Sequence, residues 1–154
     1  MSSRYFEDVQ IGDSQEFGSR TLSKEEIISF AEKFDPQPFH IDEEAAKSSQ
    51  FGGIIASGWQ TASVTMRMMV DNMIDTSASL GSPGVNNLRW YKPVRPGDTL
   101  RVRSEVMSKK RSQSRTTMGT IFGKIEVFNQ NDEMVMSFES IGLTQCRPQT
   151  PLKF

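Results

Sequence analysis

Asp35 and His40 stand five residues apart in the segment Asp-Pro-Gln-Pro-Phe-His, and His40 is the only histidine in the chain. A neutral imidazole can accept or deliver a proton near pH 7, and a nearby carboxylate can work with it as an acid/base pair. Pro36 and Pro38 stiffen the segment, and its bend could bring both side chains to one point. The residues alone leave a second interpretation open, in which Asp35 is a cap and His40 is a surface or hydrogen-bonded histidine.

Ser57 and Gly58 form a second candidate, at the predicted start of a long helix. Backbone N–H groups at a helix N-terminus have no intrahelical partner, and the helix dipole favours negative charge there. The Gly58 N–H could therefore stabilise a negative oxygen that develops on a substrate carbonyl. The alternative is a purely structural pair, an N-cap serine followed by the first helical residue.

The elements that must position these residues fall into a helical first half and a second half of strands. The segment from Ser14 to Leu22 could form the first strand. Ser23 and Glu26 then fit a capping box, which predicts a helix that stops near Asp35 because Pro36 disfavours helical geometry in the residue before it. Pro38 is expected to keep the next residues extended, and Asp42 is expected to cap a short helix from Glu43 to Ser48.

A longer helix is predicted from Ser57 or Gly58 to about Met73. Steps of three and four residues place one apolar stripe on it, made of Trp59, Ala62, Met66, Met69 and Met73. We interpret this stripe as the face that packs in the core. Methionine side chains also suit an adaptable binding surface, which is the alternative.

Strand signals dominate after Gly84. Strands are predicted at 85–94, 99–108, 116–128 and 133–143, with a turn at 129–132 that makes the last two a hairpin. The basic run of Lys109, Lys110 and Arg111 with Arg115 is predicted to be a solvated hairpin end, with contact to cofactor phosphates as the alternative. Early helices and a late antiparallel sheet predict an α+β fold, in which a curved sheet wraps one long helix.

Composition sets limits on function. A length of 154 residues suits one domain, 1–154, and 36% hydrophobic residues suffice for one core. A net charge of -1 carries no nucleic-acid signature. Cys146 is the only cysteine and cannot form an internal disulfide. One histidine without a cysteine cluster is poor material for a metal site, and neither a nucleophile elbow nor a phosphate loop is present.

Membrane and export signals are also missing from the printed chain. No run approaches the ~20 apolar residues of a membrane helix. Acidic residues, Glu7 and Asp8, stand where a signal peptide would have its apolar stretch, so a cytoplasmic location without a membrane partner is expected.

Taken together, three ordered motifs resemble the MaoC-like dehydratases, which include the (R)-specific enoyl-CoA hydratases. The first is Asp35 with His40 five residues on, followed by Asp42. The second is Gly58 at the opening of the central helix. The third is the aromatic, Pro-Val and Pro-Gly-Asp run from Trp90 to Asp98. The resemblance covers about Tyr5 to Thr144.

This resemblance implies a hot-dog fold, an antiparallel sheet around one central helix, in a homodimer or a higher assembly of dimers. It implies an acyl-CoA substrate, with coenzyme A as part of the substrate and no separate cofactor. It also implies that Asp35 and His40 hold and activate water, while the Gly58 N–H polarises the thioester carbonyl. Two alternatives stay open: a hot-dog acyl-CoA thioesterase and a non-catalytic acyl-CoA-binding subunit.

Three residues depart from the family pattern. Phe34 stands where glycine is frequent, Gln37 where asparagine is common, and Ser57 where many members have a second histidine. These changes put the substrate preference in doubt more than the reaction class. Phe34, Gln37 and Ser57, together with Trp59, are therefore the predicted substrate-binding residues.

Overall fold

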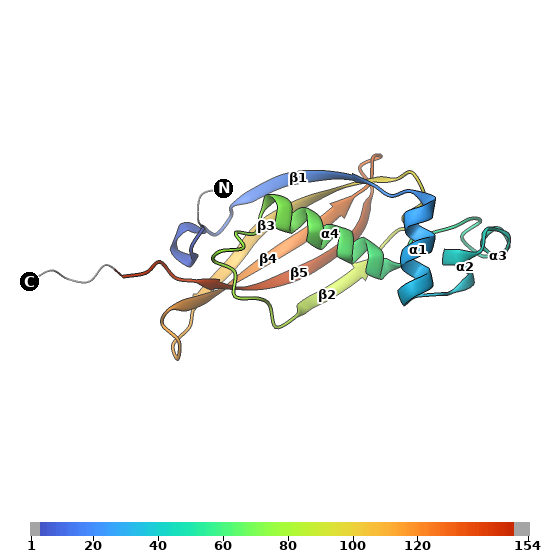
Figure 1. Cartoon of the computed structure of the whole chain (residues 1–154). Coiled ribbons are helices and arrows are strands. Elements are labelled where there is room, and N and C mark those ends of the chain that lie inside the picture. The colour runs from blue at the N-terminus through green and yellow to red at the C-terminus, as the bar shows by residue number, and fades with distance from the viewer. Residues whose placement is uncertain (1–3, 150–154) are drawn as a thin grey trace, which may run out of the picture.

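Five antiparallel strands form one sheet that curves around a single long helix (Figure 1). The computed structural model describes residues 4–149; the other residues of the predicted 1–154 domain lie outside this range. The sheet order is β1-β3-β4-β5-β2, so β1 and β2 are its edges. The strand bounds are β1 Ser14–Thr21, β2 Val85–Trp90, β3 Thr99–Arg111, β4 Met118–Phe128 and β5 Met134–Gln145. The α+β prediction and the hot-dog fold are confirmed.

The helix α1 (Lys24–Phe34) begins and ends as the sequence predicts. The Ser23 Oγ accepts a hydrogen bond from the Glu26 N–H at 3.1 Å. The Glu26 carboxylate, however, binds Arg20 at 2.8 Å, so the predicted capping box is half formed. Asp35 caps the C-terminus, and its N–H donates to the Ala31 carbonyl.

The prediction that Pro38 extends the chain is wrong. Pro38 begins a short helix, α2 (Pro38–Ile41), at a position where proline's missing N–H costs nothing and its fixed φ suits the helix. The predicted cap at Asp42 is confirmed: its carboxylate accepts hydrogen bonds from the N–H groups of Glu44 and Ala45, and α3 spans Glu43–Lys47. A short 3-10 turn, η1, spans Phe6–Asp8.

The central helix, α4, spans Gly58–Asn72 with Ser57 as its N-cap, as predicted. Its buried face differs from the predicted stripe. The helix buries Gln60, Thr61, Thr65, Met68 and Met69. Trp59 and Met66 are 58% and 46% exposed, so the stripe interpretation is wrong for them. Apolar spacing misplaced the face because threonines can be buried when their hydroxyls are satisfied, as Thr65 is by the Thr61 carbonyl at 2.8 Å.

The strand β1 crosses α4 at a glycine. Gly18 has φ +86, and a Cβ built there would collide with the Met68 side chain, so a residue without a side chain is needed at this crossing. The register of the pair β1/β3 shifts between Phe17 and Arg20, beside this glycine. The core between α4 and the sheet includes Leu22, Leu100, Val102, Ile125, Val127, Val135 and Met136, all nearly inaccessible.

The largest differences from the predicted strand boundaries are at the ends of β2 and β3. The strand β2 ends at Trp90 rather than Val94, and the segment that follows contains Pro93, which cannot donate to a ladder. The strand β3 continues to Arg111, so the basic run forms its end, beside the turn to β4, with Lys110 and Arg111 exposed. The β4/β5 hairpin is confirmed. From Arg4 to Gln149, the chain forms no helix that is long and apolar enough to span a membrane.

Candidate active site

Asp35, His40 and Ser57 meet where three helix ends come together. Asp35 is the C-cap of α1, His40 lies in α2, and Ser57 is the N-cap of α4. The Asp35 Oδ2 atom lies 3.2 Å from His40 Nε2 and accepts a hydrogen bond from Ser57 Oγ at 2.7 Å. The structure therefore brings together the two residues of the predicted acid/base pair and the residue before Gly58.

The imidazole of His40 is buried and held in one orientation. Its Nδ1 lies 2.7 Å from the Ile55 carbonyl oxygen, and the Phe39 ring packs edge-on at a centroid distance of 4.5 Å. Because a carbonyl can only accept, Nδ1 carries a proton, and Nε2 is the nitrogen whose lone pair is left for a ligand or a partner. Nε2 faces Asp35.

The Asp35 carboxylate is largely buried and receives several hydrogen bonds. Burial raises the pKa of Asp35, but donation from Gln37 and Ser57 and the proximity of His40 outweigh it, so the pKa lies below its ordinary value. Gln37 Nε2 donates to Oδ1 at 2.7 Å, while Ser57 and His40 share Oδ2. Asp35 is therefore a carboxylate at neutral pH.

Gly58 opens α4 beside this cluster. Among the described residues its N–H has no hydrogen-bond partner, which leaves a donor at the positive end of the helix dipole. A Cβ at Gly58 would overlap the Trp90 ring, and the Trp90 indole N–H donates to the Gly58 carbonyl at 3.0 Å. Glycine is needed here for space.

The remaining predicted site residues differ in how closely they approach Asp35 and His40. Gln37 touches Asp35 directly. Trp59 is exposed and packs edge-on against Trp90 at a centroid distance of 5.2 Å. Phe34 is 70% exposed on α1, and its ring packs against Phe30 rather than against the pair.

Sequence reasoning missed two contributors to the site. The Ile55 carbonyl sets the His40 tautomer, and a backbone group carries no sequence signal. Trp90 covers Gly58, and its place in the aromatic run that carries the family resemblance was the available signal. The arrangement as a whole can hold a proton between an imidazole and a carboxylate, next to a free backbone donor.

Comparisons with known proteins agree on one family. A family model described as a MaoC-like domain matches residues 7–127. The uncharacterized protein YdeM of Bacillus subtilis is 32% identical over 133 residues, which cover 86% of this chain and 93% of that protein. An (R)-specific enoyl-CoA hydratase of Rhodospirillum rubrum is 31% identical over 140 residues, which cover 85% of this chain and 91% of that enzyme.

Among solved structures, a MaoC-like dehydratase from Rhodospirillum rubrum superposes with a TM-score of 0.88 at 36% identity. The match covers 96% of this chain and 100% of that one.

Proposed function

The chain belongs to the MaoC-like dehydratase family, and from this membership we propose that it adds water reversibly to a 2-enoyl-CoA to give a 3-hydroxyacyl-CoA. The observation that carries the proposal is the convergence of Asp35, His40 and the free Gly58 N–H at one place. The hydratase relative from Rhodospirillum rubrum supports the reaction class. Coenzyme A is part of the substrate in this proposal, and no separate cofactor takes part.

Asp35 and His40 would hold the attacking water. A water molecule bonded to Asp35 Oδ2 and His40 Nε2 can lose a proton to this pair as its oxygen attacks C3. The bond to Ile55 keeps Nε2 directed at the water throughout. In the reverse direction, the same nitrogen returns the proton to the leaving hydroxyl.

The Gly58 N–H would bind the thioester carbonyl oxygen. When the water oxygen bonds to C3, the electron pair of the C2–C3 double bond moves toward the carbonyl and makes an enolate-like oxygen. A backbone donor at a helix N-terminus stabilises that charge more than it stabilises the neutral carbonyl. A proton from the pair then arrives at C2, so one hydrogen and one hydroxyl have been added and the enzyme is restored.

The other predicted residues are proposed to contact the substrate around this centre. Ser57 and Gln37 orient the Asp35 carboxylate and would also border the reacting carbons. Trp59, exposed beside Gly58, could pack against the thioester, and Phe34 could contact the coenzyme-A portion from the outside of α1.

The test is hydration of a panel of 2-enoyl-CoA substrates, followed as loss of enoyl absorbance. Asp35→Asn and His40→Gln should each lower kcat/KM by about a hundredfold or more. Asp42→Asn is the matched control: it makes the same carboxylate-to-amide change nearby and preserves an N-cap side chain. Wild-type rates in both Asp35→Asn and His40→Gln would contradict the proposal.

Two further readouts separate the alternatives. Release of free thiol, detected with a thiol reagent, would identify a thioesterase in place of a hydratase. Tight acyl-CoA binding with neither hydration nor thiol release would identify a non-catalytic binding subunit.

We also propose that two copies associate through the face made by α4 and β2. The edge strand β2 presents unpaired backbone groups, which are a template for pairing with another strand. Large apolar side chains are exposed on the same two elements: Trp59, Met66, Val70, Val85 and Trp90. A second copy would cover them, and a homodimer is the assembly that the family resemblance implies.

A further inference from the structure

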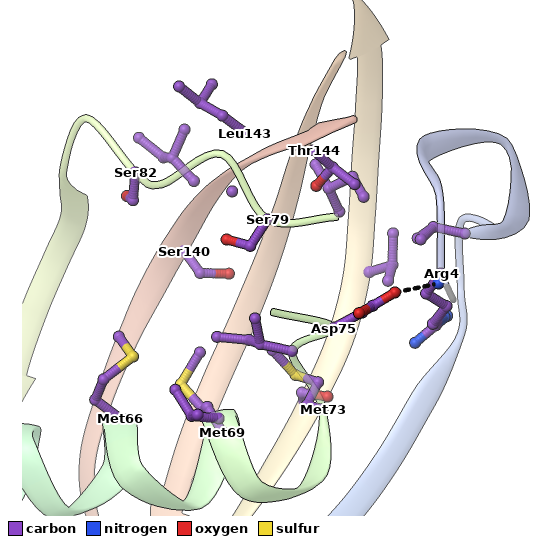
Figure 2. A pocket seen from close by; sticks show the side chains of 18 of the residues that line it. Arg4, Met66, Met69, Met73, Asp75, Ser79, Ser82, Ser140, Leu143 and Thr144 are labelled. Atoms are coloured by element: carbon purple, nitrogen blue, oxygen red, sulfur yellow. Dashed lines mark hydrogen bonds between the residues drawn. The ribbon is translucent and has the colours of Figure 1, made fainter. Parts of the chain in front are cut away.

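A cavity of about 730 Å³ lies between the C-terminal half of α4 and the sheet (Figure 2). Met66, Met69 and Met73 form its helix wall, and Phe138 and Ser140 of β5 contribute to its sheet wall. The loop after α4 lines another side through Ser79 and Ser82. The volume lies within the ~300–1,000 Å³ typical of small-molecule sites. The residues of the acid/base pair do not line it.

The face of α4 that starts at Gly58 leads to this cavity. At helical spacing, Gly58, Ala62, Met66, Met69 and Met73 share one face. The first of these residues carries the free N–H, and the last three line the cavity. The stripe that apolar spacing marked as core is therefore, in its second half, a wall of the cavity.

The dimensions indicate what could reach the cavity from Gly58. A rise of ~1.5 Å per residue puts Met66 about 12 Å and Met69 about 16 Å along the helix from Gly58. Carbon–carbon bonds of ~1.5 Å advance an extended alkyl chain by about 1.25 Å per carbon. An acyl chain of about ten carbons would reach Met66, and one of about thirteen would reach Met69.

We propose that this cavity binds the distal end of a medium- to long-chain acyl group whose thioester carbonyl is bound at Gly58. The inference rests on the proposed function and specifies its substrate class. Methionine side chains are flexible and adapt to chains of varying length. Burial of each further methylene should strengthen binding by about fourfold.

The charges at the cavity favour an uncharged chain end. The charged residues of its lining are Arg4, Asp13 and Asp75. The Arg4 guanidinium pairs with Asp13 at 3.0 Å, and the Arg4 backbone N–H donates to Asp75 at 2.7 Å (Figure 2). Because Arg4, the one cation among the described lining residues, is already paired, a carboxylate at the far end of the acyl chain would find no free cation among them. A plain alkyl end fits best.

The test compares crotonyl-CoA with dodecenoyl-CoA. Ser140→Phe would fill the cavity from its sheet wall, and Ser108→Phe makes the same change at an exposed position of β3 outside the cavity. The wild type and Ser108→Phe should prefer dodecenoyl-CoA by at least about tenfold in kcat/KM. In Ser140→Phe, kcat/KM for dodecenoyl-CoA should fall at least about tenfold, with crotonyl-CoA within about twofold.

A second pair of variants tests the same inference if Ser140→Phe does not fold. Met66→Trp would narrow the cavity at a position that is 46% exposed, and Met107→Trp is its control, at 51% exposure on β3 and outside the cavity. Met66→Trp, but not Met107→Trp, should show the same selective fall in kcat/KM for dodecenoyl-CoA. A preference of the wild type for crotonyl-CoA, or an equal loss of both substrates in a folded cavity variant, would overturn the inference.

Direct binding separates this inference from the proposed hydration. Unreactive dodecyl-CoA and butyl-CoA thioethers are titrated by calorimetry into the wild type and Ser140→Phe. Dodecyl-CoA should bind the wild type at least about a hundredfold more tightly, and the difference should shrink in Ser140→Phe. This result without turnover of any enoyl-CoA would support the chain site and reject the hydratase. Equal binding of the two thioethers would reject the chain site, whatever the turnover.

Side chains of a second copy are the alternative occupant of the cavity. In that case, Ser140→Phe would weaken the assembly in light scattering and leave the chain-length preference unchanged. That pair of results would overturn the inference.

Discussion

At Asp35, three side chains converge on one carboxylate. Gln37 binds Oδ1, while Ser57 and His40 share Oδ2. Burial raises the pKa of Asp35, and these partners more than reverse the effect, so the pKa is lowered. The contribution of these contacts to stability is present above the ordinary pKa of an aspartate and is lost as the pH falls through the lowered one. A working base at Asp35 should therefore persist into mildly acidic solution.

The acid limb of the pH profile should report this carboxylate. In Gln37→Leu, one donor to Asp35 is lost, so its pKa should rise and the acid limb of kcat/KM should move to higher pH. Gln50→Leu is the control, because Gln50 is exposed and has no hydrogen bond to the carboxylate. An unchanged acid limb in Gln37→Leu would mean that another group sets it.

Gly58 should tolerate no side chain. Gly58→Ala would push a methyl group into the Trp90 ring, and overpacking of this kind typically costs about 1–3 kcal/mol. We expect a lower free energy of unfolding in urea and a clear loss of kcat, because the helix N-terminus must shift. Gly53→Ala is the control, since its Cβ would meet only the Arg95 Nη1 atom, at 3.8 Å. In the double variant Gly58→Ala, Trp90→Ala, the added space should restore part of the stability.

At the scale of the elements, the site depends on where α1, α2 and α4 begin and end. Pro36 follows the C-cap Asp35, Pro38 begins α2, and Ser57 begins α4. Helix termini leave backbone groups without partners, so they are suited to hold caps and ligands. Here one residue, Ser57, caps α4 and also binds the Asp35 carboxylate.

The N-cap of α1 should contribute measurably to the stability of the protein. Ser23→Ala removes the acceptor of the Glu26 N–H and should lower the free energy of unfolding by about 1 kcal/mol. Ser29→Ala, an exposed position inside the same helix, should be neutral or slightly stabilising because alanine is the better helix former. Both are measured by urea denaturation. Equal stability of the two variants would show that the Ser23 cap contributes nothing measurable.

For the molecule as a whole, the sheet leaves β2 as an edge strand (Figure 1). Apolar side chains of α4 are also exposed, among them Trp59, Met66 and Val70. Val85 on β2 and Met66 on α4 are both 46% exposed, and both line the cavity. A large exposed apolar surface of this kind marks an interaction site. The proposed second copy would cover this face and the side of the cavity that Met66 and Val85 line.

Light scattering tests this association. The wild type should have at least twice the 17.4 kDa mass of one chain. Val85→Glu places a charge on the proposed interface and should shift the mass toward that of a single chain. Met107→Glu, at 51% exposure on β3, should leave the assembly intact. A single-chain mass for the wild type at every concentration would contradict the proposed homodimer.

Much of the fold was predictable because it follows local rules. The N-caps at Ser23, Asp42 and Ser57, the stop of α1 before Pro36 and the β4/β5 hairpin all depend on a few neighbouring residues. The motif of Asp35 and His40 was equally visible, because both residues lie within six consecutive positions of the sequence. Pro38 was misjudged because the same residue suits both an extended segment and the first turn of a helix.

Only the tertiary structure decided the surroundings of these residues. The Ile55 carbonyl that orients His40, the Trp90 ring over Gly58 and the side of α4 that faces the sheet all depend on segments distant in sequence. Apolar spacing identifies which α4 residues share a face, but not what covers that face. The stripe from Trp59 to Met73 is therefore predictable from the sequence. Which of its residues are exposed and which line the cavity depends on how the sheet is placed around α4.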